Sequence, residues 1–177
     1  MTYWLNKINT ITEEFIQQFG HLPNDVIMDA PEGQWSIALH VEHLMQVNRS
    51  YFPVFDQIIE GKYSPPKWAL LKPWVSFCGD MVYKAVKPET RKKTSTLPLW
   101  EPELIHDGSS LWEAFQSHQE HLIHYFNQLS PLVPKGLVIA SPANRMIIYT
   151  LEKALMIIPA HELRHLNHAM TVKKTLL

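Results

Sequence analysis

The chain has 177 residues, of which 46% are hydrophobic and 19% are charged, and its formal net charge is -1. A chain of this length is typically one domain that buries enough surface to fold without disulfides, so we expect a single domain over residues 1–177. The small net charge gives no reason to expect nucleic acid or a membrane as a partner. Cys78 is the only cysteine, which excludes an internal disulfide and a thiolate-rich metal site.

The first part of the chain predicts two amphipathic helices. Apolar residues recur every three or four positions from Trp4 to Phe19, which is the spacing of a helix with one buried face. A second helix is expected to run from Ser36, its N-cap, to about Ile59, with Pro53 kinking or interrupting it. We see no secretory signal and no run that approaches the ~20 apolar residues needed to cross a bilayer, so we expect a cytoplasmic protein.

Residues 62–107 form a long connection rich in proline and tryptophan. Disordered segments are usually poor in aromatic residues, so we expect an ordered crossover packed against the helices, with a short helix near Gly79–Val86. The stretch from Trp74 to Phe77 is interpreted as buried, which would leave the neighbouring Cys78 protonated and inert as a nucleophile. The basic run at 91–93 is interpreted as a solvated bend and not as a nucleic-acid patch.

Two further helices are predicted in the remainder of the chain. The third opens with a capping box that has Ser110 at the N-cap, and it ends before Pro131. The fourth runs from about Thr150 to about Val172, with a kink predicted at Pro159. Strand-like alternation is weak throughout. These elements predict an all-α fold, a four-helix bundle with a long proline- and aromatic-rich crossover between helices two and three.

His161 and His165 lie four residues apart on the apolar face of the fourth predicted helix. Two imidazoles at this spacing can converge on one ion at about 2.0–2.1 Å. The same segment matches the HExxH pattern of zinc proteases, in which Glu162 would be the general base. Those proteases take a third ligand from well downstream, yet only a short lysine-rich tail follows His168. A third ligand is therefore expected from upstream.

Three upstream histidines face inward on their predicted helices: His43, His40 and His118. His43 lies most centrally on its face. Three imidazoles would leave a coordination position open to water or substrate, as in a catalytic metal site, where water or a thiol becomes a usable nucleophile. His40, His118 and Tyr125 are further candidates for lining a pocket. The alternative for any single histidine is a core or boundary residue that is hydrogen-bonded to a carbonyl or to water.

The segment 35–44 resembles the DinB-like and YfiT-like four-helix-bundle metalloproteins, because Trp35 and Ser36 start a helix and a histidine follows eight residues after the tryptophan, at His43. The His161 to His165 pair in the last helix and the place of the crossover are also similar to that family. The resemblance covers most of the chain. It implies that these three histidines bind a divalent ion such as zinc or nickel at one end of the bundle, and that the protein forms a homodimer.

Membership of that family indicates the scaffold better than the reaction. Some members are metal-dependent hydrolases, and others transfer or isomerise substrates with a low-molecular-weight thiol. The resemblance thus implies a metal-dependent hydrolase or thiol (S-)transferase that acts on a small molecule. No general base is evident, because Glu42 and Glu162 are each rotated about 100° around the helix from the neighbouring ligand. The alternative is a noncatalytic module that the metal, or a polar core network, stabilises.

Overall fold

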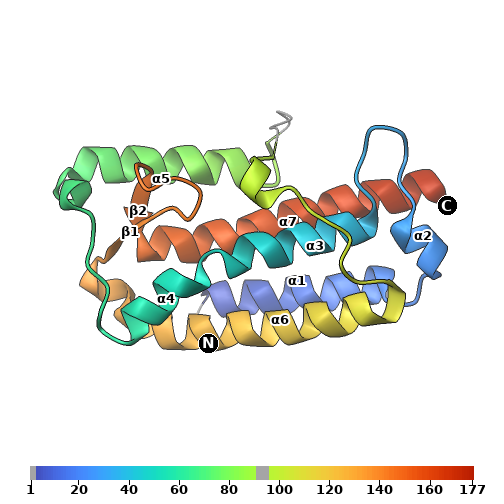
Figure 1. The fold of residues 1–177 in the computed structure, drawn as a ribbon, viewed down its shortest axis with the longest axis horizontal. Helices are drawn as coiled ribbons and strands as arrows, with labels where there is room; N and C mark the ends of the chain where they lie inside the picture. The colour runs from blue at the N-terminus through green and yellow to red at the C-terminus, as the bar shows by residue number, and fades with distance from the viewer. Residues whose placement is uncertain (1–2, 91–95) are drawn as a thin grey trace.

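The computed structural model describes residues 3–90 and 96–177 and is mostly helical (Figure 1). No helix within these ranges is both long enough and apolar enough to cross a membrane. The α-helices in chain order are α1 (Tyr3–Phe19), α2 (Asn24–Met28), α3 (Ile37–Arg49), α4 (Phe52–Ile59), α5 (Lys72–Val86), α6 (Gly108–Leu129) and α7 (Leu151–Leu176). The shorter elements are the 3-10 helices η1 (Lys67–Leu70), η2 (Pro98–Trp100) and η3 (Ser130–Lys135) and the strands β1 (Val138–Ala140) and β2 (Ile148–Thr150).

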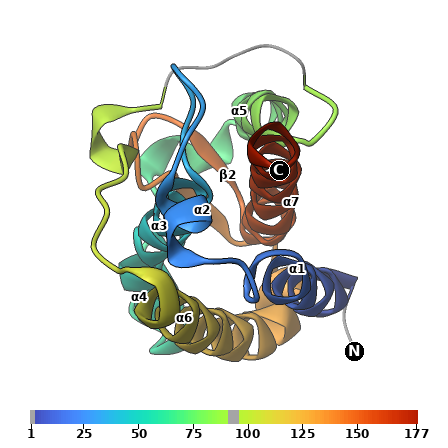
Figure 2. The ribbon, with the colours of Figure 1, turned by 90° about the vertical axis from the view of Figure 1, so that its right-hand side faces the viewer.

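Four helices, α1, α3, α6 and α7, run side by side along the long axis of the molecule (Figures 1 and 2). α1 and α3 each pack against both α6 and α7, so the four helices enclose a common interior. α5 lies on the outer side of α7 and also contacts β2. The ordered, packed crossover that the sequence predicts is therefore present, although its basic run at 91–93 lies outside the described residues.

The second predicted helix is divided into two. Ser36 is the N-cap of α3, as predicted, and its Oγ accepts a hydrogen bond from the backbone N–H of Leu39 at 3.1 Å. α3 ends at Arg49 and α4 begins at Phe52, with Pro53 in the first turn of α4. Proline is tolerated there because the first N–H groups of a helix have no partner inside the helix. Pro53 thus interrupts the helix.

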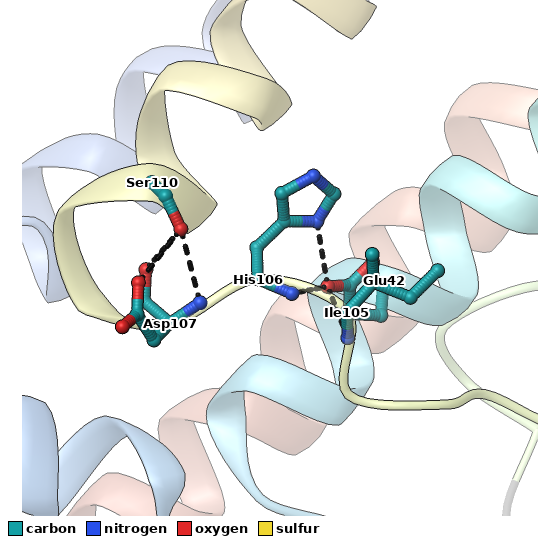
Figure 3. Close-up of polar contacts among 5 residues, drawn as sticks. All are labelled: Glu42, Ile105, His106, Asp107 and Ser110. Carbon is teal, nitrogen blue, oxygen red and sulfur yellow. Dashed lines mark hydrogen bonds and ion pairs between the residues drawn. The ribbon is translucent and has the colours of Figure 1, made fainter.

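The predicted N-cap of the third helix is wrong by one turn. Asp107 is the N-cap of α6, and Ser110 is its third residue. The Ser110 hydroxyl accepts a hydrogen bond from the backbone N–H of Asp107 at 3.0 Å and donates one to Asp107 Oδ1 at 2.8 Å (Figure 3). Aspartate and serine are comparably good N-caps, so the pattern of residue types did not distinguish the two positions. α7 begins where predicted, with Thr150 as its N-cap, and continues through Pro159 to Leu176.

The short helix predicted near Gly79–Val86 is the second half of a longer one, α5, which begins at Lys72. The interpretation of its first residues as buried is wrong: Trp74 is 41% and Phe77 is 58% exposed. α5 covers α7 with one face only, which carries Cys78 and Gly79, and Cys78 is buried as expected. A Cβ atom at Gly79 would lie 3.1 Å from the Cβ of Tyr149, so glycine permits this close approach.

The small hairpin formed by β1 and β2 was not predicted from the sequence. The strands are antiparallel, with Val138 opposite Thr150, and each has three residues. Runs this short do not show a recognisable alternation. The hairpin precedes α7 directly and places Tyr149 in the core, where its hydroxyl lies 2.7 Å from that of Tyr51 on the break between α3 and α4.

The interior of the molecule contains two apolar clusters. One includes Tyr51, Phe55 and Leu155, and the other includes Phe15 and Phe115. On α6 and α7 a few buried polar residues lie in sequence between the residues of the two clusters. These residues, together with their hydrogen-bond partners on α1 and α3, form what we call the polar layer: Thr12, Asn48, His118, Gln119 and Glu162.

Candidate metal centre

The three histidines that the resemblance selects lie together in the structure. His43 comes from α3, and His161 and His165 come from successive turns of α7, which packs against α3. His161 Nε2 lies 3.4 Å from His43 Nε2 and 3.0 Å from His165 Nε2. We call these residues the histidine triad. One ring nitrogen from each lies within 4.8 Å of the other two, so the group has the geometry of a possible metal site.

The spacing of the triad fits the donor set of one ion. Two nitrogens that bind the same ion at about 2.0–2.1 Å, with an angle of about 90–110° between them, lie about 2.9–3.4 Å apart. The distances from His161 Nε2 to His43 Nε2 and to His165 Nε2, 3.4 and 3.0 Å, fall at the ends of this range. The residues present therefore fit a divalent ion held by imidazoles.

The orientation of His43 is set by the crossover. Its Nδ1 lies 2.7 Å from the carbonyl oxygen of Trp100. A carbonyl can only accept a hydrogen bond, so Nδ1 carries the proton and the lone pair of His43 is on Nε2, which faces the triad. Trp35 packs against the same group, with its ring 5.0 Å from that of His43 and stacked at 6.0 Å on that of His165.

Burial favours the neutral form of every imidazole in the triad. Desolvation lowers the pKa of His43, and it lowers the pKa of His161 and of His165 well below the usual value, with the neighbouring histidines adding to the effect on these two. A neutral imidazole has a free lone pair, and this is the form that binds metals. The cluster is thus prepared to bind a cation near neutral pH.

His40 and His168 lie beside the triad. His40 Nδ1 is 3.0 Å from His165 Nδ1, and both side chains are buried. His168 is exposed at the rim, with its ring 5.7 Å from those of His40 and His165. His40, His165 and His168 form a second group of three ring nitrogens within 4.8 Å of one another. Burial, with a contribution from His168, lowers the pKa of His40 to about 3.

Residues 97–107, which we call the strap, cross over α3 next to the triad. Glu42 is buried, and its Oε1 accepts hydrogen bonds from the backbone N–H of Ile105 at 3.1 Å and from the backbone N–H of His106 at 2.8 Å (Figure 3). His106 Nδ1 lies 2.8 Å from the same oxygen. Gln46 adds a hydrogen bond to the carbonyl of Leu99 at 2.9 Å. Glu42 is therefore used to hold the strap and does not face the triad, in agreement with the prediction.

Glu162 also points away from the triad. It is completely buried in the polar layer, where it accepts hydrogen bonds from Asn48 Nδ2 at 2.7 Å and from Gln119 Nε2 at 3.1 Å. Burial raises its pKa to about 7, against the opposing effect of these two hydrogen bonds. The match to the HExxH pattern therefore does not provide the general base of a zinc protease, which would have to face the metal.

The other two pocket candidates lie elsewhere. His118 belongs to the polar layer, where its Nε2 is 3.3 Å from Asn48 Nδ2. Tyr125 donates a hydrogen bond to Asp56 Oδ1 at 2.7 Å. It lines a cavity of about 410 Å³ between α4 and α6, formed by Phe52, Asp56, Ile59, Glu60, His121, His124, Tyr125 and Gln128. No triad residue lines that cavity, so we do not assign it to the metal centre.

Two parts of the site were missed by the sequence analysis. The Trp100 carbonyl is a backbone atom, which every residue has, so residue type gives no signal for it. The contact between His40 and His165 joins residues 125 positions apart. The spacing of three residues between His40 and His43 is compatible with a shared helical face. It indicated that His40 lies near the site, but not that His165 is its partner.

No family model, curated protein or solved structure matches this chain.

Removing His118 is expected to reduce the loss of unfolding free energy that the metal-free protein shows at acidic pH. Burial, with smaller contributions from Arg49 and His121, lowers its pKa from 6.5 to about 3. Below pH 6.5 the unfolded chain therefore takes up a proton at His118 that the folded chain does not. The stability that depends on a neutral His118 is fully present above pH 6.5 and is lost as the pH falls from 6.5 toward 3. One unit of pKa difference corresponds to about 1.4 kcal/mol.

Urea unfolding at pH 7 and pH 5 measures this effect. Between these pH values, His118→Leu should lose about 2 kcal/mol less unfolding free energy than the wild type. His124→Leu replaces an exposed histidine of the same helix that does not contribute to the lowered pKa of His118, and it should keep the wild-type dependence. Equal losses in all three proteins would show that His118 is not held neutral.

Proposed function

We propose that the protein binds one divalent ion, zinc or nickel, through the Nε2 atoms of His43, His161 and His165. The observation that carries the proposal is the convergence of three ring nitrogens from α3 and α7, two of them on buried side chains, at distances that suit a shared ion. Neutral imidazole is a suitable ligand for both metals. Cys78, the only thiol, is buried on α5 and lies outside both histidine groups.

We further propose that the chain is a four-helix bundle of the DinB-like and YfiT-like type. The arrangement of α1, α3, α6 and α7, with the crossover after the second of them, supports this assignment. The residues that carry the sequence resemblance also have physical roles at the site. Ser36 caps the helix that carries His43, and Trp35 packs against the rings of His43 and His165.

An ion held by three imidazoles keeps a coordination position for a further ligand. When bound, such an ion would act as a Lewis acid and lower the pKa of a water or thiol ligand. His161 is partly exposed, whereas His43 and His165 are buried, so a small molecule would reach the triad from the side of His161. This access supports a catalytic role over a purely structural one.

Of the two reaction classes, we favour transfer of a low-molecular-weight thiol to a small electrophile over hydrolysis. Both carboxylates next to ligands in sequence are engaged elsewhere, Glu42 with the strap and Glu162 with the polar layer. A reaction at the triad would therefore have to proceed without either as a base. A thiol, with an unperturbed pKa of about 8.5, needs less assistance to lose its proton than water, at about 15.7.

We propose that the protein is a homodimer, as the resemblance implies, and that the outer face of α5 forms the interface. Trp74, Phe77 and Met81 are exposed along this helix at intervals of three and four residues. The rings of Trp74 and Phe77 stack at 5.6 Å, and Leu71 and Met146 extend the apolar surface. A two-fold axis would pair this surface with its own copy, which is how most homodimers associate.

Metal content tests the ligand assignment. The wild type, His43→Ala and His165→Ala are loaded with zinc, desalted and measured by elemental analysis. We expect about one zinc per chain in the wild type and at least 100-fold weaker binding in the variants, since loss of a ligand should exceed the roughly 10–100-fold effect of losing an outer hydrogen-bond partner. His121→Ala should bind as the wild type does. Equal zinc content in all four proteins would exclude these ligands.

Cobalt substitution tests for an open coordination position. Adding a small thiol to the Co²⁺-loaded wild type should produce a sulfur-to-cobalt charge-transfer band and shift the visible spectrum, because a further ligand enters. The zinc-loaded protein should then consume the thiol together with a small electrophile, and His165→Ala should not. A spectrum that neither thiol nor azide changes would indicate a saturated, structural ion. Turnover that needs no thiol would indicate hydrolysis.

Sedimentation tests the dimer. The wild type should sediment as a dimer, and Trp74→Glu and Phe77→Glu should each shift it to the monomer, because a charge would be buried at the centre of the apolar surface. Leu104→Glu, which places the same charge on an exposed residue of the strap, should remain dimeric. A monomeric wild type at high concentration, or dimeric α5 variants, would contradict the proposed interface.

A further inference from the structure

His165 belongs to both groups of three histidines. Its Nε2 faces His161 Nε2 at 3.0 Å, and its Nδ1 faces His40 Nδ1 at 3.0 Å. A neutral imidazole has one lone pair and one N–H, so His165 cannot bind one ion through Nε2 and another through Nδ1. The two groups are therefore alternatives, and only one of them can be filled by an ion at a time.

The hydrogen bond of His43 indicates which group binds. Since its Nδ1–H is donated to the Trp100 carbonyl at 2.7 Å, its lone pair is on Nε2, which lies 3.4 Å from His161 Nε2. The second group consists of His40, His165 and His168. Of these, His168 is exposed, and no hydrogen bond to a described residue orients its ring. The oriented lone pairs thus favour the Nε2 triad.

This choice determines the role of His40. If His165 binds through Nε2, its single proton is on Nδ1. Two N–H groups cannot face each other at 3.0 Å, so the Nδ1 of His40 must then carry the lone pair and accept the hydrogen bond. The stacked ring of Trp35, 6.0 Å from that of His165 and inclined by 22°, restricts the alternative ring orientations.

We propose that His40 is a positioning residue of the metal centre and not a ligand: it accepts a hydrogen bond from Nδ1–H of His165 and thereby presents Nε2 of His165 to the ion. This inference rests on the proposed function. His40 does for His165 what the Trp100 carbonyl does for His43. One buried ligand thus has a side-chain partner from α3, and the other has a backbone partner from the strap.

Zinc titration of His40 variants tests this role. His40→Leu removes the acceptor and should weaken zinc binding about 10–100-fold, the usual effect of losing such a partner, while saturating zinc still gives one ion per chain. His40→Asn should restore most of that affinity, because its Oδ1 occupies the position of Nδ1 and can only accept. A residue that merely fills space would not show this rescue.

His168→Leu separates the two histidine groups. If the ion is bound by the Nε2 triad, this variant should bind zinc within about threefold of the wild type. A loss of affinity as large as that of His40→Leu would show that the second group binds the ion and would overturn the inference. Equally weak binding by His40→Asn and His40→Leu would also overturn it, because an acceptor at that position would then be irrelevant.

The outcomes distinguish this inference from the proposed function. A wild type that binds no zinc removes both. A wild type that binds one zinc, with normal affinity in His40→Leu, removes only the role of His40. Circular dichroism shows whether each variant is folded. Long-range ¹H–¹⁵N NMR couplings report histidine tautomers, and in the zinc-loaded wild type they should show a protonated Nδ1 on His165. Protonation on Nε2 instead would contradict the assignment.

Discussion

The histidine cluster depends on one constraint, the close packing of α3 against α7, which brings the rings of His43 and His165 to 4.7 Å. Buried polar groups need partners, and the Nδ1 atoms of these rings have them in the Trp100 carbonyl and His40. Their Nε2 atoms face His161 Nε2. The three Nε2 atoms have too few N–H protons among them for each to be hydrogen-bonded to another. A divalent cation between them, as proposed, would resolve this conflict, because it would take a lone pair from each.

The polar layer fixes the rotation of α7, and with it the direction of His161 and His165. Glu162 is completely buried and hydrogen-bonded to residues of α3 and α6. Because neighbouring residues are about 100° apart around a helix, a carboxylate held in the interior directs His161 toward the outer side of the interface between α3 and α7. Turning α7 to bring Glu162 toward the triad would leave Asn48 and Gln119 without their acceptor in the core. The match to the HExxH pattern is thus explained by packing.

Amphipathic spacing predicted the four long helices, and the pair at His161 and His165 with the start at Trp35 predicted which histidines meet. The helices and the His161 to His165 pair depend on local periodicity, which sequence displays directly, whereas the link from Trp35 to His43 comes from the family resemblance. The exposure of Trp74 and Phe77 was predicted wrongly, because residue type does not indicate that α5 has a packing partner on one side only. The partner of His43 could not be predicted at all. It is a backbone oxygen 57 residues away, and its position depends on the path of the crossover.

That path makes the crossover a part of the site. Neighbouring residues of α3 bind the strap in complementary ways: Glu42 accepts its N–H groups, and His43 donates to its Trp100 carbonyl. Metal binding at Nε2 makes the opposite N–H of an imidazole a stronger donor, and an oriented acceptor in turn makes the imidazole a better ligand. If the triad binds an ion as proposed, ion binding and docking of the strap would therefore strengthen each other through the single ring of His43. The strap thus orients one member of the triad, because Glu42 and Gln46 hold it on α3 and its Trp100 carbonyl fixes the tautomer of His43.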